Sequence, residues 1–235
     1  MGKTIVYQDL GLISYQEAWD YQTQLFEAVI GRKLHNRKAS ATDQVEQYHH
    51  LLLCEHPHVY TLGRNGKVAH LLLDDEGLQA RQATFHSINR GGDITYHGFG
   101  QVVGYPILDL DEFFTDIARY IRLLEGAIIL TLAPYGIVGN RIAGLSGVWI
   151  DPTGENPRKI CAVGVHLSRW TTMHGFALNV NTDLSYFGHI VPCGIDDKAV
   201  TSMQAELGKA VDPEPVKAAI RQHLAQLLEA SYRDS

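Results

Sequence analysis

Residues 147–167 read GVWIDPTGENPRKICAVGVHL, and the pattern of this segment indicates the fold class. Two runs rich in β-branched and aromatic residues flank the segment PTGENPR, whose proline and glycine residues are typical of a turn. The pattern predicts two strands joined by that turn. Residues 174–181, HGFALNVN, extend the meander by a third strand. Hairpins in the middle of the chain argue against a strict alternation of strands and crossover helices.

Apolar residues at helical spacing occur on both sides of these strands. Near the N-terminus, Ser14 and Glu17 form a capping box ahead of a helical pattern. Residues 111–132 are predicted to form a second helix, and Asp212 with Pro213 begins a third. The inward face of the third helix is predicted to consist of four apolar residues: Val216, Ile220, Leu224 and Leu227.

Two further apolar segments, residues 48–56 and 58–63, are predicted to be buried strands that are joined at His56 and Pro57. Strands and helices are thus interspersed, with hairpins in the middle of the chain. This arrangement indicates an α+β fold. We expect a single domain over residues 1–235, in which helices flank a mixed β-sheet.

The composition is that of an ordinary globular protein and excludes several classes. The 235 residues are 45% hydrophobic and 20% charged, enough to bury a sizeable core. No stretch reaches the roughly 18 apolar residues of a membrane span, and the N-terminal residues lack the apolar region of a signal peptide. The net charge of -6 argues against nonspecific nucleic-acid binding. We therefore expect a cytoplasmic protein that binds neither membranes nor nucleic acid.

The three cysteines have no CxxC spacing, so neither a disulfide framework nor a metal site is expected. Cys54 and Cys161 lie within apolar runs and are predicted to be buried and inert. Cys193 lies between a proline and a glycine, a setting that predicts a sharp bend and an accessible thiol. A structural cysteine in a turn is the alternative.

A reactive Cys193 would need help, because a free thiol has a pKa of about 8.5. Lys159, His97 and His174 are the candidate neighbours, and sequence spacing does not choose among them. Lys159 opens the apolar strand RKICAVGVHL, where partial desolvation would lower its pKa and allow proton transfer near neutral pH. A solvent-exposed lysine at a strand end is the ordinary alternative.

The segment 90–106, RGGDITYHGFGQVVGYP, is unusually rich in glycine. Glycines let the backbone approach a ligand closely and present N–H groups to an oxygen atom, and Arg90 and His97 add polar groups. The spacing matches neither the Walker phosphate loop nor the dinucleotide-binding fingerprint. A turn-rich hairpin without a ligand explains the glycines equally well.

Four motifs in order, RGGDITYHG-x-GQ, RKICAVGVH, HGFALNVNTDL and PCGI, make the chain resemble the octanoyltransferases, also called lipoate-protein ligase B. The resemblance covers most of the chain. It implies the catalytic fold shared with biotin and lipoate protein ligases. It also implies transfer of an octanoyl or lipoyl group from the thioester of an acyl carrier protein to a lysine of a lipoyl domain, with no metal and no other cofactor.

The same resemblance implies which residues act. The PCG cysteine falls on Cys193 and the RKI lysine on Lys159, which would form a catalytic pair that works through an acyl-cysteine thioester. The substrate-lining segments of the family fall on three groups of residues: Arg90, Gly91, Gly92, Asp93, Ile94, Thr95, Tyr96 and His97; Ala162, Val163 and Gly164; and Gly175, Phe176 and Ala177.

The implied donor is octanoyl-acyl carrier protein. The implied acceptors are the lipoyl domains of 2-oxoacid dehydrogenases and the glycine cleavage H protein. Four alternatives stay open: an ATP-dependent lipoate or biotin protein ligase, an octanoyl amidotransferase between lipoyl-type proteins, a cysteine hydrolase that uses Cys193 with His174, and a non-catalytic carrier-binding module.

Two features of the chain carry separate expectations. Phe99 replaces the proline that is usual in the HGPGQ motif, and its ring is predicted to narrow or re-line the acyl pocket. Acidic partners suit a protein of negative net charge only if a local basic rim docks them. That rim is predicted to consist of four basic residues: Arg32, Lys33, Arg141 and Arg158.

Overall fold

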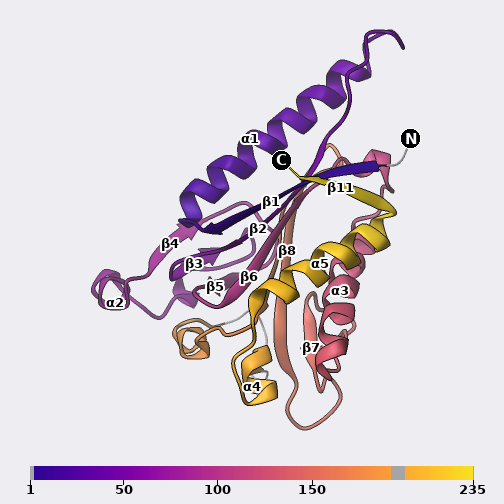
Figure 1. The fold of residues 1–235 in the computed structure, drawn as a ribbon. Coiled ribbons are helices and arrows are strands. Elements are labelled where there is room, and N and C mark those ends of the chain that lie inside the picture. The colour runs from indigo at the N-terminus through magenta and orange to yellow at the C-terminus, as the bar shows by residue number, and fades with distance from the viewer. Residues whose placement is uncertain (1–2, 192–198, 235) are drawn as a thin grey trace.

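Two β-sheets organise the chain in the computed structural model, which describes residues 3–191 and 199–234 (Figure 1). In that part of the chain the larger sheet has eight strands. Seven of them lie in the order β10 (Ala199–Val200), β8 (Arg158–Ser168), β9 (Thr171–Asn179), β6 (Gln101–Ile107), β2 (His49–Glu55), β1 (Lys3–Leu12) and β11 (Ala230–Asp234). β1 runs parallel to β2 and β11, whereas β2, β6, β9 and β8 are antiparallel in turn, so the sheet is mixed as predicted.

The predicted meander is present. The eighth strand, β7 (Val148–Ile150), pairs antiparallel with β8, and β8 pairs antiparallel with β9. Arg169 and Trp170 connect β8 to β9 with φ angles of 51° and 61°. A two-residue turn with both residues in the left-handed region matches the twist of the strands it joins. The hairpin is therefore closed by local backbone geometry as well as by the ladder.

The smaller sheet has the order β4 (Thr84–Ser87), β3 (Val59–Leu62) and β5 (Ile94–His97) in the described residues. The chain passes from the larger sheet to the smaller one at His56–Pro57 and returns at residues 98–100. β5 and β6 thus belong to different sheets. The interpretation of residues 90–106 as a hairpin is wrong, because Gly98 and Gly100 cross between sheets instead of turning back within one.

Helices cover both faces of the larger sheet (Figure 1). On one face, α1 (Tyr15–Asn36) contacts β6 and β9, and its inward side packs against Leu52, Cys54 and Val103. On the other face, α3 (Ile117–Leu132) packs beside α5 (Pro213–Leu228) over the main core. Two short helices complete the described set: α2 (Asp75–Ala80) and α4 (Met203–Leu207). Within the described residues, none of these helices is both long and apolar enough to span a membrane.

Helix starts follow the prediction at two of three sites, at Ser14 for α1 and at Asp212 for α5, where the Asp212 carboxylate accepts from the Glu214 N–H at 3.0 Å. Ser14 Oγ accepts a hydrogen bond from the Glu17 backbone N–H at 3.3 Å and donates to Glu17 Oε2 at 2.5 Å, so the two residues of the predicted capping box meet at the start of α1. The helix predicted from residue 111 begins at Ile117 instead, because the Asp116 carboxylate caps it and a 3-10 turn, Leu110–Glu112, precedes it.

The inward face of α5 also differs from the prediction at its last position. Leu228 is buried, 4% exposed, while Leu227 is 37% exposed. Successive steps of four residues from Val216 carry the buried stripe to Leu228, so the helical repeat, and not the nearest leucine, decides which side chain enters the core.

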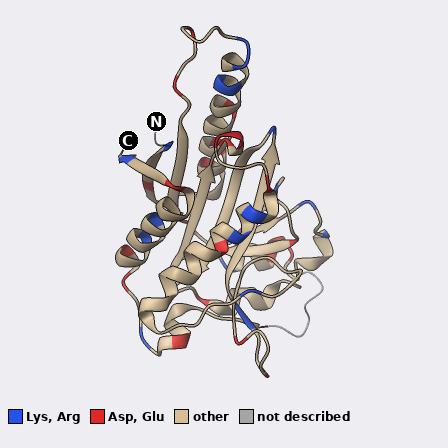
Figure 2. Ribbon diagram, turned by 90° about the vertical axis from the view of Figure 1, so that its right-hand side faces the viewer, with Lys and Arg blue, Asp and Glu red and all other residues tan. Residues whose placement is uncertain are grey.

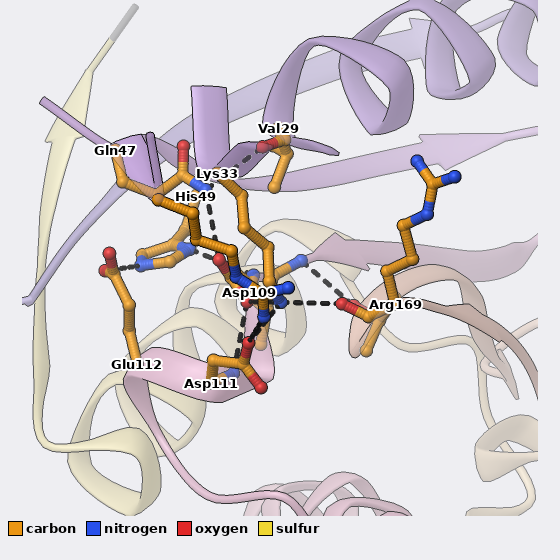
Figure 3. Close-up of polar contacts among 11 residues, drawn as sticks. Val29, Lys33, Gln47, His49, Asp109, Asp111, Glu112 and Arg169 are labelled. Atoms are coloured by element: carbon orange, nitrogen blue, oxygen red, sulfur yellow. Dashed lines mark hydrogen bonds and ion pairs between the residues drawn. The ribbon is translucent and has the colours of Figure 1, made fainter. Parts of the chain in front are cut away.

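The C-terminal part of α1 is fixed by a buried charge cluster (Figure 3). Lys33 Nζ lies 2.6 Å from Asp109 Oδ1 and 2.7 Å from Asp111 Oδ2, and it donates to the Arg169 carbonyl oxygen at 2.6 Å. The side chains of Lys33 and Asp109 are each only 4% exposed. Gln47 donates to the second oxygen of Asp109 at 3.1 Å. The cluster therefore joins α1 to the β8–β9 turn and to the segment after β6.

Replacing Lys33 by alanine should lower the free energy of unfolding by about 3–5 kcal/mol, because Asp109 is then a buried carboxylate without its main partner. The matched control is Arg37→Ala. Arg37 pairs with Asp111 at 2.7 Å but is 58% exposed, so its loss should cost at most about 1 kcal/mol. Urea unfolding of both variants measures the difference. Equal losses of unfolding free energy in the two variants would show that burial does not strengthen the contribution of Lys33 to stability.

Candidate active site

Two adjoining cavities lie beside the pairing of β8 with β9. The glycine-loop cavity, of ≈ 250 Å³, is bounded by residues 90–93 and by Tyr15, Tyr105 and His174. The apolar cavity, of ≈ 610 Å³, is bounded by large side chains that include Trp149, Phe187 and Ile190. The two cavities share part of their wall, which consists of Ile94, Thr95, Lys159, Ala162 and Ala177.

The structure brings nearly all the sequence-predicted substrate residues to the glycine-loop cavity. From the first group, residues 90–95 and His97 line it, and so do all members of the second and third groups. Tyr96 lines neither cavity in the described part of the chain. Its ring instead packs against Tyr60 and Tyr186 in the core of the smaller sheet. Cys193 lies outside the described residues.

Lys159 lies at the junction of the two cavities. It is half-buried near the start of β8, where its backbone pairs with Trp149 of β7 on one side and with Val200 of β10 on the other. Its Nζ atom lies 4.6 Å from the centre of the Trp149 ring, a contact in which the aromatic face attracts the ammonium. A lysine at the head of an apolar strand thus points toward the cavities and not into open solvent.

Glycines in β8 and β9 bring the glycine loop close to the sheet. Gly164 lies opposite Gly175 in the ladder. A Cβ atom at Gly164 would lie 3.1 Å from the Gly91 carbonyl oxygen, and one at Gly175 would overlap the Gly104 carbonyl oxygen. Larger residues would therefore push the loop or the neighbouring strand away and change the shape of the cavity.

Arg90 holds the glycine loop in place. Its guanidinium donates to the Thr61 carbonyl oxygen at 2.6 Å, to Thr61 Oγ1 at 3.0 Å and to the Gly91 carbonyl oxygen at 3.0 Å. The Gly91 N–H in turn donates to the Val165 carbonyl oxygen at 2.9 Å. Burial lowers the pKa of Arg90. These bonds tie the loop to the smaller sheet and to β8 at once.

The two histidines of the glycine-loop cavity are neutral. Burial lowers the pKa of His97 to about 3, and His56 and Arg90 add to the effect. Burial and Arg90 likewise lower the pKa of His174 to about 3. His174 Nε2 lies 2.7 Å from Asn89 Oδ1, and the residue pairs with Val165, six positions along β8 from Lys159. His174 lines the glycine-loop cavity but not the apolar cavity.

Sequence relationships agree with this geometry. The family model of the lipoyl protein ligase A/B catalytic domain matches residues 14–225. An octanoyltransferase of Cytophaga hutchinsonii is 59% identical over 230 residues, which cover 97% of this chain and 93% of that protein.

The chain belongs to the octanoyltransferases of the lipoyl protein ligase A/B family.

The family assignment made from the four motifs is therefore confirmed, and it places the chain among the transferase enzymes.

Solved structures of low sequence identity share the fold of this octanoyltransferase-family chain. A bipartite lipoate protein ligase from Thermoplasma acidophilum, from a structural analysis that also concerns its E2 lipoyl domain, is 18% identical with a TM-score of 0.69, and the match covers 100% of this chain and 86% of that one. A biotin protein ligase from Aquifex aeolicus in complex with biotin and ATP is 16% identical with a TM-score of 0.52, and the match covers 97% and 71%. The expected α+β fold of the biotin and lipoate ligases is confirmed.

Cys54 and Cys161 are fully buried, as their apolar surroundings predicted. Burial raises the pKa of both thiols. Since the thiolate is the nucleophilic form, neither sulfur is suited to attack a substrate.

The position of Phe99 contradicts the prediction that its ring narrows or re-lines the acyl pocket. It is 45% exposed, its ring packs edge-on against His58 at 5.0 Å, and it lines neither cavity. The chain crosses between the two sheets at this point, so the side chain stays on the surface. Phe99 therefore does not narrow a cavity.

Several cavity residues have no clear signal in the sequence. Tyr15 comes from the first turn of α1, and Trp149, Leu184 and Phe187 come from β7 and a 3-10 turn, Leu184–His189. Each has the appearance of an ordinary core residue in its own segment. Trp149 reaches Lys159 through the β7–β8 hairpin, whereas the packing of distant segments brings Tyr15, Leu184 and Phe187 to the cavities that Lys159 lines.

The neutral histidines predict that stability falls as the pH drops from 7 to 5. In the unfolded chain a histidine titrates near 6.5, so the unfolded state binds more protons than the folded state in this range. Burial lowers the pKa of His56 to about 4, and those of His97 and His174 to about 3. Well below pH 6.5, each of these histidines lowers the free energy of unfolding by up to about 1.4 kcal/mol for every pH unit that the pH falls.

Urea unfolding at pH 7, 6 and 5 measures this slope above the range in which carboxylates titrate. His174→Gln should reduce the slope. Stability that stays constant between pH 7 and pH 5 would contradict the neutral, buried state of these histidines.

Proposed function

We propose that the chain transfers an octanoyl group from acyl carrier protein to a specific lysine of lipoyl domains through a thioester on Cys193. The observation that carries the proposal is the position of Lys159 at the junction of the two cavities. Val191 and Ala199, the described residues on either side of segment 192–198, line the same apolar cavity as Lys159. This placement supports a pairing of Lys159 with the cysteine of that segment.

The choice of nucleophile is supported by elimination. The sequence has three cysteines, and two of them are buried with raised thiol pKa values. Cys193 is the third. In the proposed mechanism the ammonium of Lys159 stabilises the Cys193 thiolate by its charge.

The proposed reaction consists of two acyl transfers at one site. The Cys193 thiolate attacks the carrier thioester carbonyl, a new C–S bond forms, and the bond to the carrier thiol breaks. The Lys159 ammonium gives its proton to the leaving thiolate. The acceptor lysine then attacks the acyl-cysteine as a neutral amine, the C–N bond forms, and the bond to Cys193 breaks. Neutral Lys159 takes the proton that the amine loses, which restores the ammonium–thiolate pair.

This route needs no nucleotide, because the carrier thioester already activates the acyl group and the enzyme thioester preserves that activation. The walls of the glycine-loop cavity, which include Val103, Phe176 and Ala177, would hold the acyl chain. Each methylene buried there contributes about 0.8 kcal/mol to binding.

The proposed acceptors are the lipoyl domains of 2-oxoacid dehydrogenases and the glycine cleavage H protein. Family membership supports this choice, as does the neighbour of the same fold from Thermoplasma acidophilum that was studied with its E2 lipoyl domain. We further propose that the protein works in the cytoplasm and binds neither nucleic acid nor membranes.

The predicted docking rim needs revision, because its four basic residues make contacts within the chain. Lys33 is buried with Asp109, Arg158 forms a two-point ion pair with Glu206, Arg141 pairs with Glu125, and Arg32 lies over the Tyr48 ring. Lys and Arg are scattered among Asp and Glu over the ribbon (Figure 2). Arg64 and Lys67 are exposed beside the glycine loop, where the Arg64 N–H donates to the Arg90 carbonyl oxygen at 3.0 Å. We propose that these two cations contribute to docking.

Other reaction types receive less support. A hydrolase that pairs Cys193 with His174 is disfavoured, because His174 does not line the apolar cavity that Val191 and Ala199 line. An ATP-dependent ligase would share the fold but would need nucleotide for transfer. An amidotransferase between lipoyl-type proteins would take its acyl group from an octanoyl-protein amide and not from a carrier thioester.

The proposal is tested by incubating the protein with octanoyl-acyl carrier protein in the absence of nucleotide. Intact-mass measurement should show one added octanoyl group, and peptide mapping should locate it on Cys193. The double variant Cys54→Ala/Cys161→Ala should keep the adduct, and Cys193→Ser should lose it. Subsequent addition of a lipoyl domain should move the group to a lysine of that domain. An adduct on another residue would disprove the nucleophile, and transfer that requires ATP would favour the ligase.

A further inference from the structure

A chain of hydrogen bonds leads from the wall of the glycine-loop cavity to the backbone of Lys159. His97 Nδ1 donates to Gln101 Oε1 at 2.8 Å, and Gln101 Nε2 donates to Asn179 Oδ1 at 2.9 Å. Asn179 Nδ2 donates to the Thr201 carbonyl oxygen at 2.9 Å. The Thr201 N–H donates to the Lys159 carbonyl oxygen at 2.9 Å. We call Gln101 and Asn179 the amide relay.

The direction of the relay is fixed by its partners. Gln101 Nε2 also donates to the Tyr96 carbonyl oxygen at 3.2 Å, so its oxygen must face His97. Asn179 faces a carbonyl oxygen at Thr201 and can only donate there. The three side-chain bonds thus run the same way, from the imidazole to the Thr201 carbonyl oxygen, and bonds aligned in this manner polarise and strengthen one another. The Thr201 N–H, which belongs to the preceding peptide group, continues the connection to Lys159 through the main chain.

Because Gln101 and Asn179 are buried, the relay restricts how far these side chains can move. Gln101 is 1% exposed and Asn179 is 4% exposed. A buried amide that loses its partner carries a desolvation penalty. The two residues lie opposite each other in the β6–β9 ladder, and both line the apolar cavity. The relay therefore forms part of the cavity wall and cannot shift without leaving polar atoms unpaired.

Thr201, which follows β10, is also connected to Arg158, the residue before Lys159. Thr201 Oγ1 donates to Glu206 Oε1 at 2.6 Å, and the same carboxylate accepts two bonds of 2.6 Å from the Arg158 guanidinium. Thr201 thus holds Lys159 through the main chain and Arg158 through Glu206. Asn179 connects this arrangement to the centre of the larger sheet.

We infer that Gln101 and Asn179 are positioning residues for Lys159, an inference that rests on the proposed function of this lysine as the proton-transfer group. The relay sets the distance between the Lys159 backbone and the cavity wall at His97. Without the donation from Asn179 to Thr201, the start of β8 loses its fixed place relative to that wall. The Lys159 amine then spends less time where it can exchange a proton with the reacting groups.

The decisive substitution is Asn179→Asp, which keeps the size of the side chain and its acceptor but removes the donor to Thr201. The matched control is Asn181→Asp, two residues further along the chain. Asn181 donates to the Val211 carbonyl oxygen at 2.7 Å and accepts from the Val211 N–H at 2.8 Å, and it lines neither cavity. Both variants lose one amide donor of similar geometry, but only Asn179 is connected to Lys159.

Two readouts are compared in the two variants. Hydrogen exchange of the Thr201 amide reports the bond to Lys159 and needs no activity. Steady-state transfer from octanoyl-acyl carrier protein gives kcat and KM. In Asn179→Asp the Thr201 amide should exchange at least tenfold faster, and kcat should fall at least tenfold while KM for the carrier stays within twofold. In Asn181→Asp the exchange rate of the Thr201 amide and kcat should each stay within twofold of the unmodified protein. The unfolding temperature of Asn181→Asp should fall by about as much as that of Asn179→Asp.

Unchanged exchange at Thr201 in Asn179→Asp would overturn the inference. An equal fall of kcat in Asn181→Asp would do the same, because the loss would then follow general stability. If the unmodified protein transfers no octanoyl group, the proposed function fails, and the exchange comparison still decides whether the relay holds Lys159. Should Asn179→Asp not fold, Gln101→Glu replaces it, since it keeps the acceptor for His97 and removes the donor to Asn179.

Discussion

The antiparallel pairing of β8 with β9 fixes the geometry of the candidate active site. Its register places Ala162 opposite Ala177 and Gly164 opposite Gly175. These small residues leave room between the ladder and the glycine loop, and the loop fills part of that room with backbone instead of side chains. Lys159 belongs to the same strand. The position of the proposed proton-transfer group and the shape of the cavity therefore follow from a single register.

Both ends of this hairpin are held by buried polar contacts. At the turn, Lys33 of α1 donates to the Arg169 carbonyl oxygen while it pairs with Asp109 (Figure 3). At the opposite end, the Thr201 N–H binds the Lys159 carbonyl oxygen. Apolar packing supplies most of the stability, with α1 on one face of the sheet and α3 with α5 on the other. The polar contacts add what hydrophobic burial lacks, which is a fixed direction and register.

Local patterns in the sequence predicted local structure well. The β7–β8–β9 meander, the capping box of α1 and the buried state of Cys54 and Cys161 all follow from neighbouring residues, and all are present. The family motifs also named residues that share one cavity wall although they are distant in the chain.

Features that depend on long-range packing were not predictable in the same way. Nothing in residues 90–106 distinguishes a hairpin from a crossing between two sheets, because the glycines permit both. The exposure of Phe99, the engagement of the expected basic rim and the place of Leu184 and Phe187 in the wall of the apolar cavity are set by other segments of the chain. The amide relay is not predictable from the sequence for the same reason, since its members meet only when β6, β9 and the segment after β10 are assembled.

The proposed pairing of Lys159 with Cys193 is tested by the rate at which iodoacetamide alkylates Cys193, measured as a function of pH by peptide mapping. If the Lys159 ammonium faces the thiol, the apparent thiol pKa should lie below the ordinary value of about 8.5 and should rise toward that value in Lys159→Met. Lys209→Met, which removes an exposed lysine that lines neither cavity, should leave it unchanged. An identical pH midpoint in the unmodified protein and in Lys159→Met would contradict the pairing and, with it, the proposed chemistry.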